Sequence, residues 1–137
     1  MKKRLLWWFG MLVYLAILLR ITVFRPGIRL DDLFSGTLNL MPLTQYLFFA
    51  RYGSWKAFIY YFAGNLIVFM PLGYLLEKKG ISWQRTILVG FLCSLLIETG
   101  QFVLGSGVAE TDDILLNTIG AVLGFTAARF FSHDTDK

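Results

Sequence analysis

Four apolar stretches constrain the fold of this chain more than any other feature of its sequence. They cover roughly residues 5–24, 57–76, 86–104 and 114–131. A helix needs about 20 apolar residues to cross the ~30 Å hydrocarbon core of a bilayer. Because 56% of the 137 residues are hydrophobic, a soluble bundle would have too little polar surface to stay dispersed. The sequence therefore predicts an all-α membrane protein, with four transmembrane helices in a single domain over residues 1–137.

The basic residues are shared unequally between the two sides that four spans would create. Eight lie before the first span, between the second and third, or near the end of the chain, namely Lys2, Lys3, Arg4, Lys78, Lys79, Arg85, Arg129 and Lys137. The opposite side carries five, namely Arg20, Arg25, Arg29, Arg51 and Lys56. Because the cytoplasmic side holds the excess of Lys and Arg, we expect both termini in the cytoplasm. The same distribution accounts for the net charge of +4, so no nucleic acid partner is expected.

The long connection between the first two spans, residues 25–56, is predicted to be a partly ordered outer loop. Its segment from Asn39 to Phe49 mixes polar and large apolar side chains and is too short to cross a membrane. A solvated linker would not need so many Leu and Phe residues. We expect this loop either to pack on the outer surface or to re-enter between the helices, where protein or water must satisfy its backbone.

Polar residues inside the predicted spans all fall in one half of the membrane, which is the outer half in this topology. They are Arg20, Asn65, Glu98, Gln101 and Asn117. A carboxylate in hydrocarbon costs about 2.5–3.5 kcal/mol on insertion scales, so Glu98 requires a partner or a use. The loop above this layer contributes three acids, Glu110, Asp112 and Asp113. The sequence thus predicts a polar layer beneath an acidic outer loop.

The spacing of small and polar residues predicts how two of the spans pack. In the third span the stripe consists of Gly90, Ser94, Glu98 and Gln101, which share one helix face. In the fourth span it consists of Asp113, Asn117, Gly120, Gly124 and Ala128. The GxxxG step of the second stripe lets another helix approach closely. We expect the third and fourth spans to pack together with Glu98 facing Asn117, and Arg20 to be the counter-charge of Glu98.

Three interpretations of Glu98 follow from this arrangement. It forms an ion pair with Arg20 that joins two helices, or it lines a binding pocket open to the outer leaflet, or it is the proton site of a transporter. The transporter is disfavoured because the sequence shows no internal repeat and no polar path to the cytoplasmic side. For Asp112 the simpler role is to cap the N-terminus of the fourth span, where a carboxylate also suits the helix dipole.

The sequence gives little support for catalysis. It contains no serine elbow, HExxH pair or phosphate loop, and its acids match no calcium loop. Cys93 is the only cysteine, which excludes an intramolecular disulfide and a cysteine-based metal site. An acid and a base can act without a motif, and Glu98 and Asp113 are the candidates. We favour a non-enzymatic protein and expect neither a metal nor a cofactor.

The same polar residues occur in an order that resembles the VanZ-like family. The order is Arg20, Asn39-Leu-Met-Pro42, Asn65 with Phe69-Met-Pro71-Leu-Gly73, Glu98-Thr-Gly-Gln101, and Asp112-Asp113-Ile-Leu-Leu-Asn117-Thr-Ile-Gly120. The resemblance extends over about residues 15–130, and it is the ordered set rather than any single piece that is specific. One departure is Leu43, where the family often has an aromatic residue after the proline.

The resemblance implies a bacterial multi-pass protein of the inner (cytoplasmic) membrane that acts at the cell envelope. The family includes a protein that gives low-level resistance to teicoplanin, a lipoglycopeptide antibiotic. We therefore expect non-catalytic binding, within the lipid bilayer, of an amphiphile such as the lipoglycopeptide or a lipid-linked cell-wall precursor. The expected ligand-binding residues are Arg20, Asn39, Asn65, Glu98, Gln101, Asp112, Asp113 and Asn117. The alternative is a small membrane enzyme that acts on a lipid-linked envelope substrate through Glu98 and Asp113.

Overall fold

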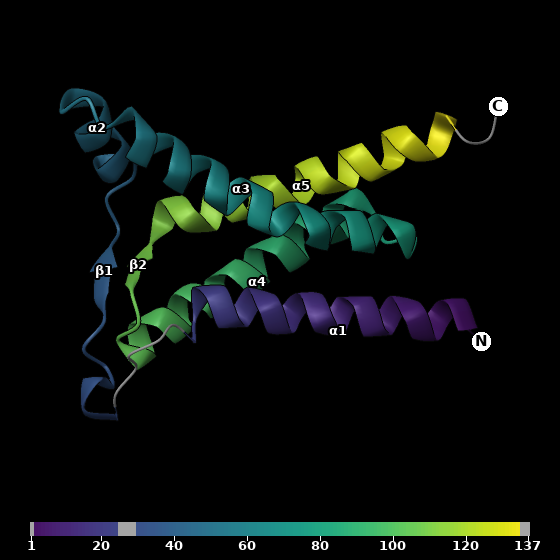
Figure 1. The fold of residues 1–137 in the computed structure, drawn as a ribbon, viewed down its shortest axis with the longest axis horizontal. Coiled ribbons are helices and arrows are strands. Elements are labelled where there is room, and N and C mark those ends of the chain that lie inside the picture. The colour runs from purple at the N-terminus through teal and green to yellow at the C-terminus, as the bar shows by residue number, and fades with distance from the viewer. Residues whose placement is uncertain (1, 25–29, 135–137) are drawn as a thin grey trace.

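The computed structural model describes residues 2–24 and 30–134 of the chain (Figure 1). Its long helices are α1 (Lys2–Thr22), α3 (Trp55–Lys78), α4 (Trp83–Leu104) and α5 (Thr111–Asp134). Between them lie the 3-10 helix η1 (Leu30–Asp32), the strands β1 (Thr37–Asn39) and β2 (Val108–Glu110), and the short helix α2 (Thr44–Arg51). The four long helices are each long and apolar enough to cross a membrane. The prediction of a mainly helical membrane protein with four such helices is confirmed.

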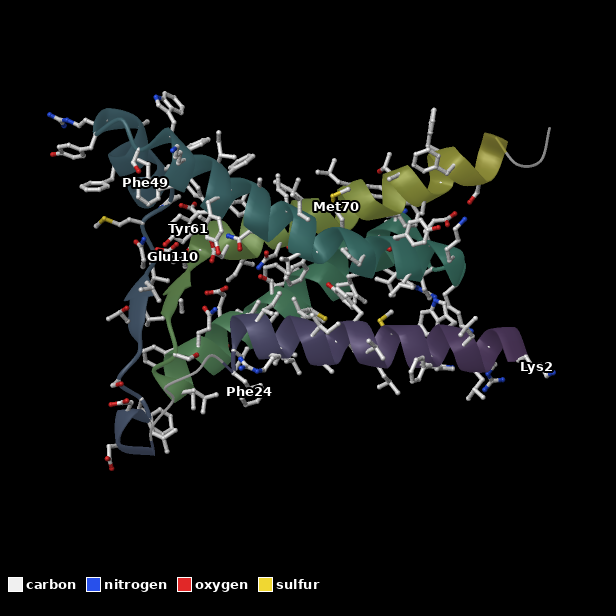
Figure 2. The ribbon with its side chains drawn as sticks, in the orientation of Figure 1. Lys2, Phe24, Phe49, Tyr61, Met70 and Glu110 are labelled. Atoms are coloured by element: carbon white, nitrogen blue, oxygen red, sulfur yellow. The ribbon has the colours of Figure 1, made fainter. Side chains whose placement is uncertain are left out.

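The bundle has two chemically different ends. The start of α1, the turn between α3 and α4, and the end of α5 lie together at one end, which we call the termini end (Figure 1). Strands β1 and β2 and helix α2 lie at the other, which we call the loop end. In Figure 2, Lys2 marks the termini end and Glu110 the loop end. The predictions for Arg25, Arg29 and Lys137 lie outside the described residues.

Helix α5 packs against both α3 and α4, and its closest approach is to α3. A Cβ atom on Gly120 would overlap the carbonyl of Leu66, and one on Gly124 would overlap the carbonyl of Met70. The GxxxG step of α5 therefore faces α3. Because Gly73 of α3 is itself pressed against the α5 backbone at Ala121, small residues on both helices permit this approach. The expected packing of the third and fourth spans is present as well, through Gly90 of α4 and Ala121 of α5.

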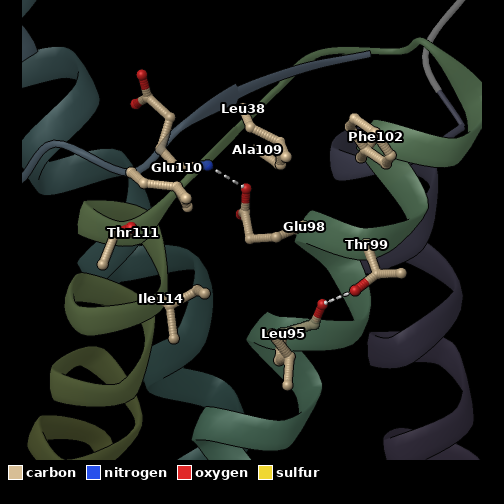
Figure 3. A pocket seen from close by; sticks show the side chains of 10 residues that line it. Leu38, Leu95, Glu98, Thr99, Phe102, Ala109, Glu110, Thr111 and Ile114 are labelled. Carbon is tan, nitrogen blue, oxygen red and sulfur yellow. Dashed lines mark hydrogen bonds between the residues drawn. The ribbon is translucent and has the colours of Figure 1, made fainter. Parts of the chain in front are cut away.

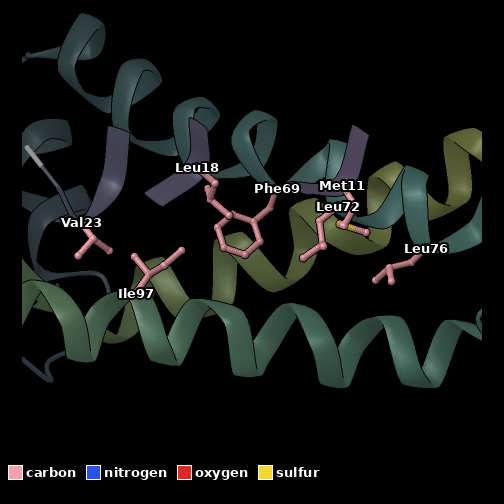
Figure 4. Close-up of a cluster of buried hydrophobic side chains, with 7 residues drawn as sticks. All are labelled: Met11, Leu18, Val23, Phe69, Leu72, Leu76 and Ile97. Atoms are coloured by element: carbon pink, nitrogen blue, oxygen red, sulfur yellow. The ribbon is translucent and has the colours of Figure 1, made fainter. Parts of the chain in front are cut away.

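The apolar core joins α1, α3 and α4 (Figure 4). It is made of Met11, Leu18, Val23, Phe69, Leu72, Leu76 and Ile97. Helix α1 is also fixed to α3 by two side-chain hydrogen bonds to main-chain carbonyls. The Trp7 indole donates to Leu75 at 2.9 Å, and the Tyr14 hydroxyl donates to Val68 at 3.0 Å. These bonds fix the position of α1 along α3, which packing against lipid alone would not do.

The outer loop lies across the loop end of the bundle instead of between the helices (Figure 1). Strand β1 pairs in parallel with β2, with Leu38 opposite Ala109 and Asn39 opposite Glu110. Before the strand, the Phe34 amide donates to the Val103 carbonyl at 2.7 Å and so holds the loop on the end of α4. This pairing satisfies backbone groups that would otherwise need water or side chains. The two short strands were not predicted from the sequence.

Helix α2 packs against the start of α3 through aromatic side chains. The rings of Phe49 and Tyr61 stack with centroids 5.5 Å apart (Figure 2). The Tyr46 ring meets Phe58 and Phe62 edge-on. Such ring pairs stabilise a contact by about 0.5–1.5 kcal/mol beyond the area they bury. They hold α2 beside the polar residues at the loop end.

Leu43 precedes α2 with a left-handed backbone, φ 63°, and a side chain that is 57% exposed. This conformation costs an L-residue about 1–2 kcal/mol, and asparagine tolerates it better. We expect Leu43→Asn to raise the free energy of unfolding in detergent micelles by about 0.5–1 kcal/mol. Leu40→Asn, which replaces another exposed leucine of the same loop (71% exposed), is the control. Equal effects of the two substitutions would show that strain at Leu43 is not the cause.

Candidate functional site

Glu98 lies near the loop end of α4 and is only 4% exposed. Its Oε2 atom accepts the backbone N–H of Glu110 at 2.9 Å (Figure 3). The Glu110 side chain in turn accepts a hydrogen bond from the Asn39 amide at 3.0 Å. Asn39, Glu110 and Glu98 therefore connect β1, β2 and α4 in one hydrogen-bonded series. Charge-assisted bonds of this kind are about twice as strong as neutral ones.

A half-open cavity of about 180 Å³ lies beside this series. Its walls are mainly apolar, with the Glu98 side chain among them (Figure 3). The lining residues are Leu38, Leu40, Leu95, Glu98, Thr99, Phe102, Ala109, Glu110, Thr111 and Ile114. They come from β1, α4, β2 and the start of α5, together with Leu40 just after β1. The site is thus closed by the outer loop as well as by the helices.

A second polar cluster joins α3, α5 and the segment before α2. The Asn65 amide donates to Oδ1 of Asp113 at 2.5 Å. Oδ2 of the buried Asp112 accepts the Leu43 N–H at 2.8 Å. Asp112 therefore fastens the outer loop to α5, and this bond differs from the capping role expected for it. Asp112 and Asp113 both lie in the first turn of α5, where carboxylates suit the helix dipole.

The two remaining amides of the predicted layer have partners of their own. The Asn117 amide donates to the Ser94 hydroxyl at 2.8 Å, and the Gln101 amide donates to the Thr22 carbonyl at 3.2 Å. The small and polar stripe of α4 is buried as predicted. The expectation that Glu98 faces Asn117 is wrong, because the Asn117 amide bonds to Ser94, which lies one helical turn before Glu98 on α4. The predicted layer consists of separate hydrogen-bonded pairs.

Arg20 does not take part in this site. Its side chain is exposed and donates to the Phe24 carbonyl at 2.7 Å. Over residues 2–24 and 30–134, no ion pair joins Arg20 to Glu98, so the prediction that Arg20 is the counter-charge of Glu98 is wrong. The physical reason is local: Arg20 lies in the last turn of α1, where a cation interacts favourably with the free carbonyls and the helix dipole.

Three features at the loop end were not predicted from the sequence. The position of the Glu110 N–H and the cavity wall formed by Leu38 both depend on the β1–β2 pairing. Strands of three residues are too short to give a recognisable alternation in the sequence. Tyr46 was missed as well, although its position among the polar and aromatic residues of the outer loop was a signal. Its side chain is 7% exposed, and its hydroxyl has no hydrogen-bond partner of good geometry among the described residues.

The two candidate catalytic acids have different partners. Glu98 accepts the Glu110 N–H, whereas Asp113 accepts the Asn65 amide. Within the described part of the chain, no three His, Cys, Asp or Glu side chains converge closely enough to hold a metal ion. Glu98 and Asp113 therefore belong to two separate hydrogen-bonded groups at the loop end.

Burial raises the pKa of Tyr46 well above its ordinary value of 10.0, and the nearby carboxylates of Asp113, Asp112 and Glu110 act in the same direction. The folded state therefore keeps the phenol neutral, and stability should fall as pH rises above about 10, where the unfolded chain ionises. We expect Tyr46→Phe to remove this contribution to the alkaline loss of stability. It should also raise stability at pH 7 by about 1 kcal/mol, because the buried hydroxyl has no hydrogen-bond partner within the described residues.

Alkaline unfolding followed by circular dichroism tests this prediction. Tyr52→Phe alters an exposed tyrosine at the end of α2 and is the matched control. If both variants lose stability in parallel with the unaltered protein from pH 9 to 12, the role given to Tyr46 is incorrect.

Four membrane-length helices that enclose buried polar pairs define a multi-pass helical membrane protein. The family model described as VanZ/LLP1 matches residues 11–132, and the chain belongs to this family. Protein VanZ of Enterococcus faecium is 28% identical over 117 residues, which cover 82% of this chain and 66% of that protein. The chain thus spans slightly less than two thirds of the length of this relative. No solved structure matches the chain.

Proposed function

We propose that this protein binds part of an envelope amphiphile in the cavity at the loop end, without chemical conversion, and so contributes to tolerance of a lipoglycopeptide such as teicoplanin. The observation that carries the proposal is Glu98, a carboxyl group buried in the wall of a cavity that is otherwise mainly apolar. An amphiphile offers both an apolar segment and polar atoms beside it, and a site of this kind matches that combination.

The volume of the cavity limits the size of the ligand that it can hold. Its volume of about 180 Å³ is below the ~300–1,000 Å³ of sites that enclose a drug-sized molecule. An apolar cavity of about 150 Å³ is large enough for benzene. A whole lipoglycopeptide is therefore excluded, whereas a short segment of its acyl chain or of a lipid-linked precursor fits.

The charge of the site favours a ligand that donates hydrogen bonds. Glu98 and Glu110 both line the cavity, and the Arg20 side chain bonds elsewhere. Hydroxyl, amide and ammonium groups of a ligand are donors that carboxylate oxygens accept. In this proposal Glu98 contacts the ligand, and Asn39 holds Glu110 in position. Five other polar residues hold the outer loop and the helices in position through their hydrogen bonds, namely Asn65, Gln101, Asp112, Asp113 and Asn117.

The proposed location is the bacterial cytoplasmic membrane, with the loop end outside and both termini in the cytoplasm. The excess of basic residues at the termini end supports this orientation. The loop-end cavity then opens near the outer leaflet, where lipid-linked precursors and lipidated antibiotics meet the membrane. The family membership and the likeness to Protein VanZ support the link to the envelope.

The proposal is tested by expression in a susceptible bacterium and exposure to teicoplanin and vancomycin in parallel. Leu95→Trp fills the cavity with a larger side chain, and we expect it to abolish any gain in tolerance of the lipidated drug. Leu96→Trp is the matched control, because Leu96 is 71% exposed and lies outside the cavity. Membrane levels are compared by immunoblot. Equal protection against both drugs, or equal activity of the two variants, would contradict binding in this cavity.

A further inference from the structure

A second cavity, of about 330 Å³, lies at the termini end, far from the site already described. It is formed by the end of α3, the turn into α4, and α5. The lining residues are Glu77, Gly80, Ile81, Ser82, Trp83, Phe125 and Arg129. Its volume falls within the ~300–1,000 Å³ typical of small-ligand sites, and it combines one acid, one base and a hydroxyl group.

Helix packing explains why an acid and a base line this cavity. Gly73 of α3 lies against the α5 backbone, and a Cβ atom there would come within 2.8 Å of the Phe125 amide nitrogen. One helical turn farther along each helix, at four-residue spacing, come Glu77 and Arg129. Within the described residues, neither of these side chains has a hydrogen bond or an ion pair. Two opposite charges therefore line the cavity without being joined to each other.

The neighbouring lysines are engaged elsewhere. The Lys78 ammonium donates to the Ser132 hydroxyl at 2.5 Å. The Lys79 ammonium lies over the rings of Trp7 and Trp8, at 5.1 and 6.0 Å from their centroids. Tryptophan and basic side chains gather in this way at the depth of lipid headgroups. Arg129 is consequently the cation that the cavity offers to a ligand at that depth.

We propose that this cavity binds the headgroup of a glycerophospholipid that carries an N–H or O–H donor beyond its phosphate. The planar guanidinium of Arg129 matches phosphate oxygens in a bidentate manner. The carboxyl group of Glu77 accepts the terminal donor, which is an ammonium in phosphatidylethanolamine and a hydroxyl in phosphatidylglycerol. Phosphatidylcholine has the phosphate but no terminal donor. This site is independent of the proposed function at the loop end.

Native mass spectrometry of the full chain in a mild detergent tests the proposal. The protein is titrated with the three phospholipids carrying identical acyl chains. We expect at least one of phosphatidylethanolamine and phosphatidylglycerol to bind about tenfold more tightly than phosphatidylcholine, the effect of one charge-assisted hydrogen bond. Whichever of the two binds more tightly identifies the donor as ammonium or hydroxyl. Equal binding of all three lipids would overturn the proposal.

Substitutions test the two proposed contacts separately, that of Arg129 with the phosphate and that of Glu77 with the terminal donor. Arg129→Gln should weaken binding of all three lipids, whereas Glu77→Gln should reduce the favoured lipid to the level of phosphatidylcholine. Arg85→Gln removes an exposed cation at the same end but outside the cavity and should change nothing. If Arg129→Gln does not fold, Arg129→Lys keeps the charge and should still weaken binding through loss of the bidentate contact. An equal loss in Arg85→Gln and the Arg129 variant would indicate general charge attraction and refute the site.

Discussion

Replacing Gly124 by leucine should prevent α5 from packing on α3 and should leave little folded protein. Any Cβ atom at this position would overlap the Met70 carbonyl, which belongs to a helix backbone and is not free to move aside. Overpacking of this kind costs about 1–3 kcal/mol, occasionally more. The loss should occur although leucine is a better helix former than glycine by up to about 1 kcal/mol. Unfolding in mixed detergent micelles, followed by circular dichroism, measures the effect.

Gly64→Leu is the matched control within the same pair of helices. A Cβ atom at Gly64 would meet nothing within 4 Å, so this substitution gains helix propensity without a clash. The free energies of unfolding of the two variants should differ by roughly 1–3 kcal/mol, which is the cost of overpacking, because the gain in helix propensity is common to both. Similar stabilities would mean that α3 and α5 do not pack through Gly124 at all.

Glu98→Gln is expected to abolish drug tolerance while leaving the protein in the membrane at its normal level. Glutamine has the same shape, and its carbonyl oxygen can still accept the Glu110 N–H. The change should therefore cost only about 1–2 kcal/mol, the difference between a charged and a neutral hydrogen bond. What it removes is the carboxyl group that the ligand would contact. The minimum inhibitory concentration of teicoplanin is the measurement.

Asp32→Asn alters an acid of the outer loop that does not line the cavity, and it should leave tolerance unchanged. Glu98→Leu keeps the bulk but leaves the Glu110 N–H without its acceptor, and it should lower both tolerance and protein level. Full tolerance in Glu98→Gln would refute the binding role. Loss of the protein itself in Glu98→Gln would instead assign Glu98 a purely structural role.

The local periodicity of apolar and polar residues was sufficient to predict the long helices and the buried face of α4. The stripe of Ser94, Glu98 and Gln101 is buried on α4, because residues three and four apart share a helix face whatever the tertiary context. The identity of the facing helix did not follow from the stripe. Gly120 and Gly124 of α5 lie against the α3 backbone at Leu66 and Met70, and a pattern within one helix carries no information about its neighbour.

For the candidate site as well, the sequence indicated which residues need partners but did not identify those partners. Glu98, Asn39 and Asp112 were selected because polar groups in or near apolar segments need partners. Their partners are backbone and side-chain groups far away in the sequence, such as the Glu110 N–H and the Leu43 N–H. Arg20 was assigned to Glu98 by charge alone, although the nearest acceptor for its side chain is a carbonyl of its own helix end.

By itself the sequence determined that this chain forms four membrane-length helices, that one face of α4 is polar and buried, and that basic residues gather at one end. These properties depend on composition and local periodicity. The tertiary structure alone decided that β1 pairs with β2, that their pairing presents the Glu110 N–H to Glu98, and that a cavity remains between them. Contacts of this kind depend on how separate segments meet in space, which a local pattern does not encode.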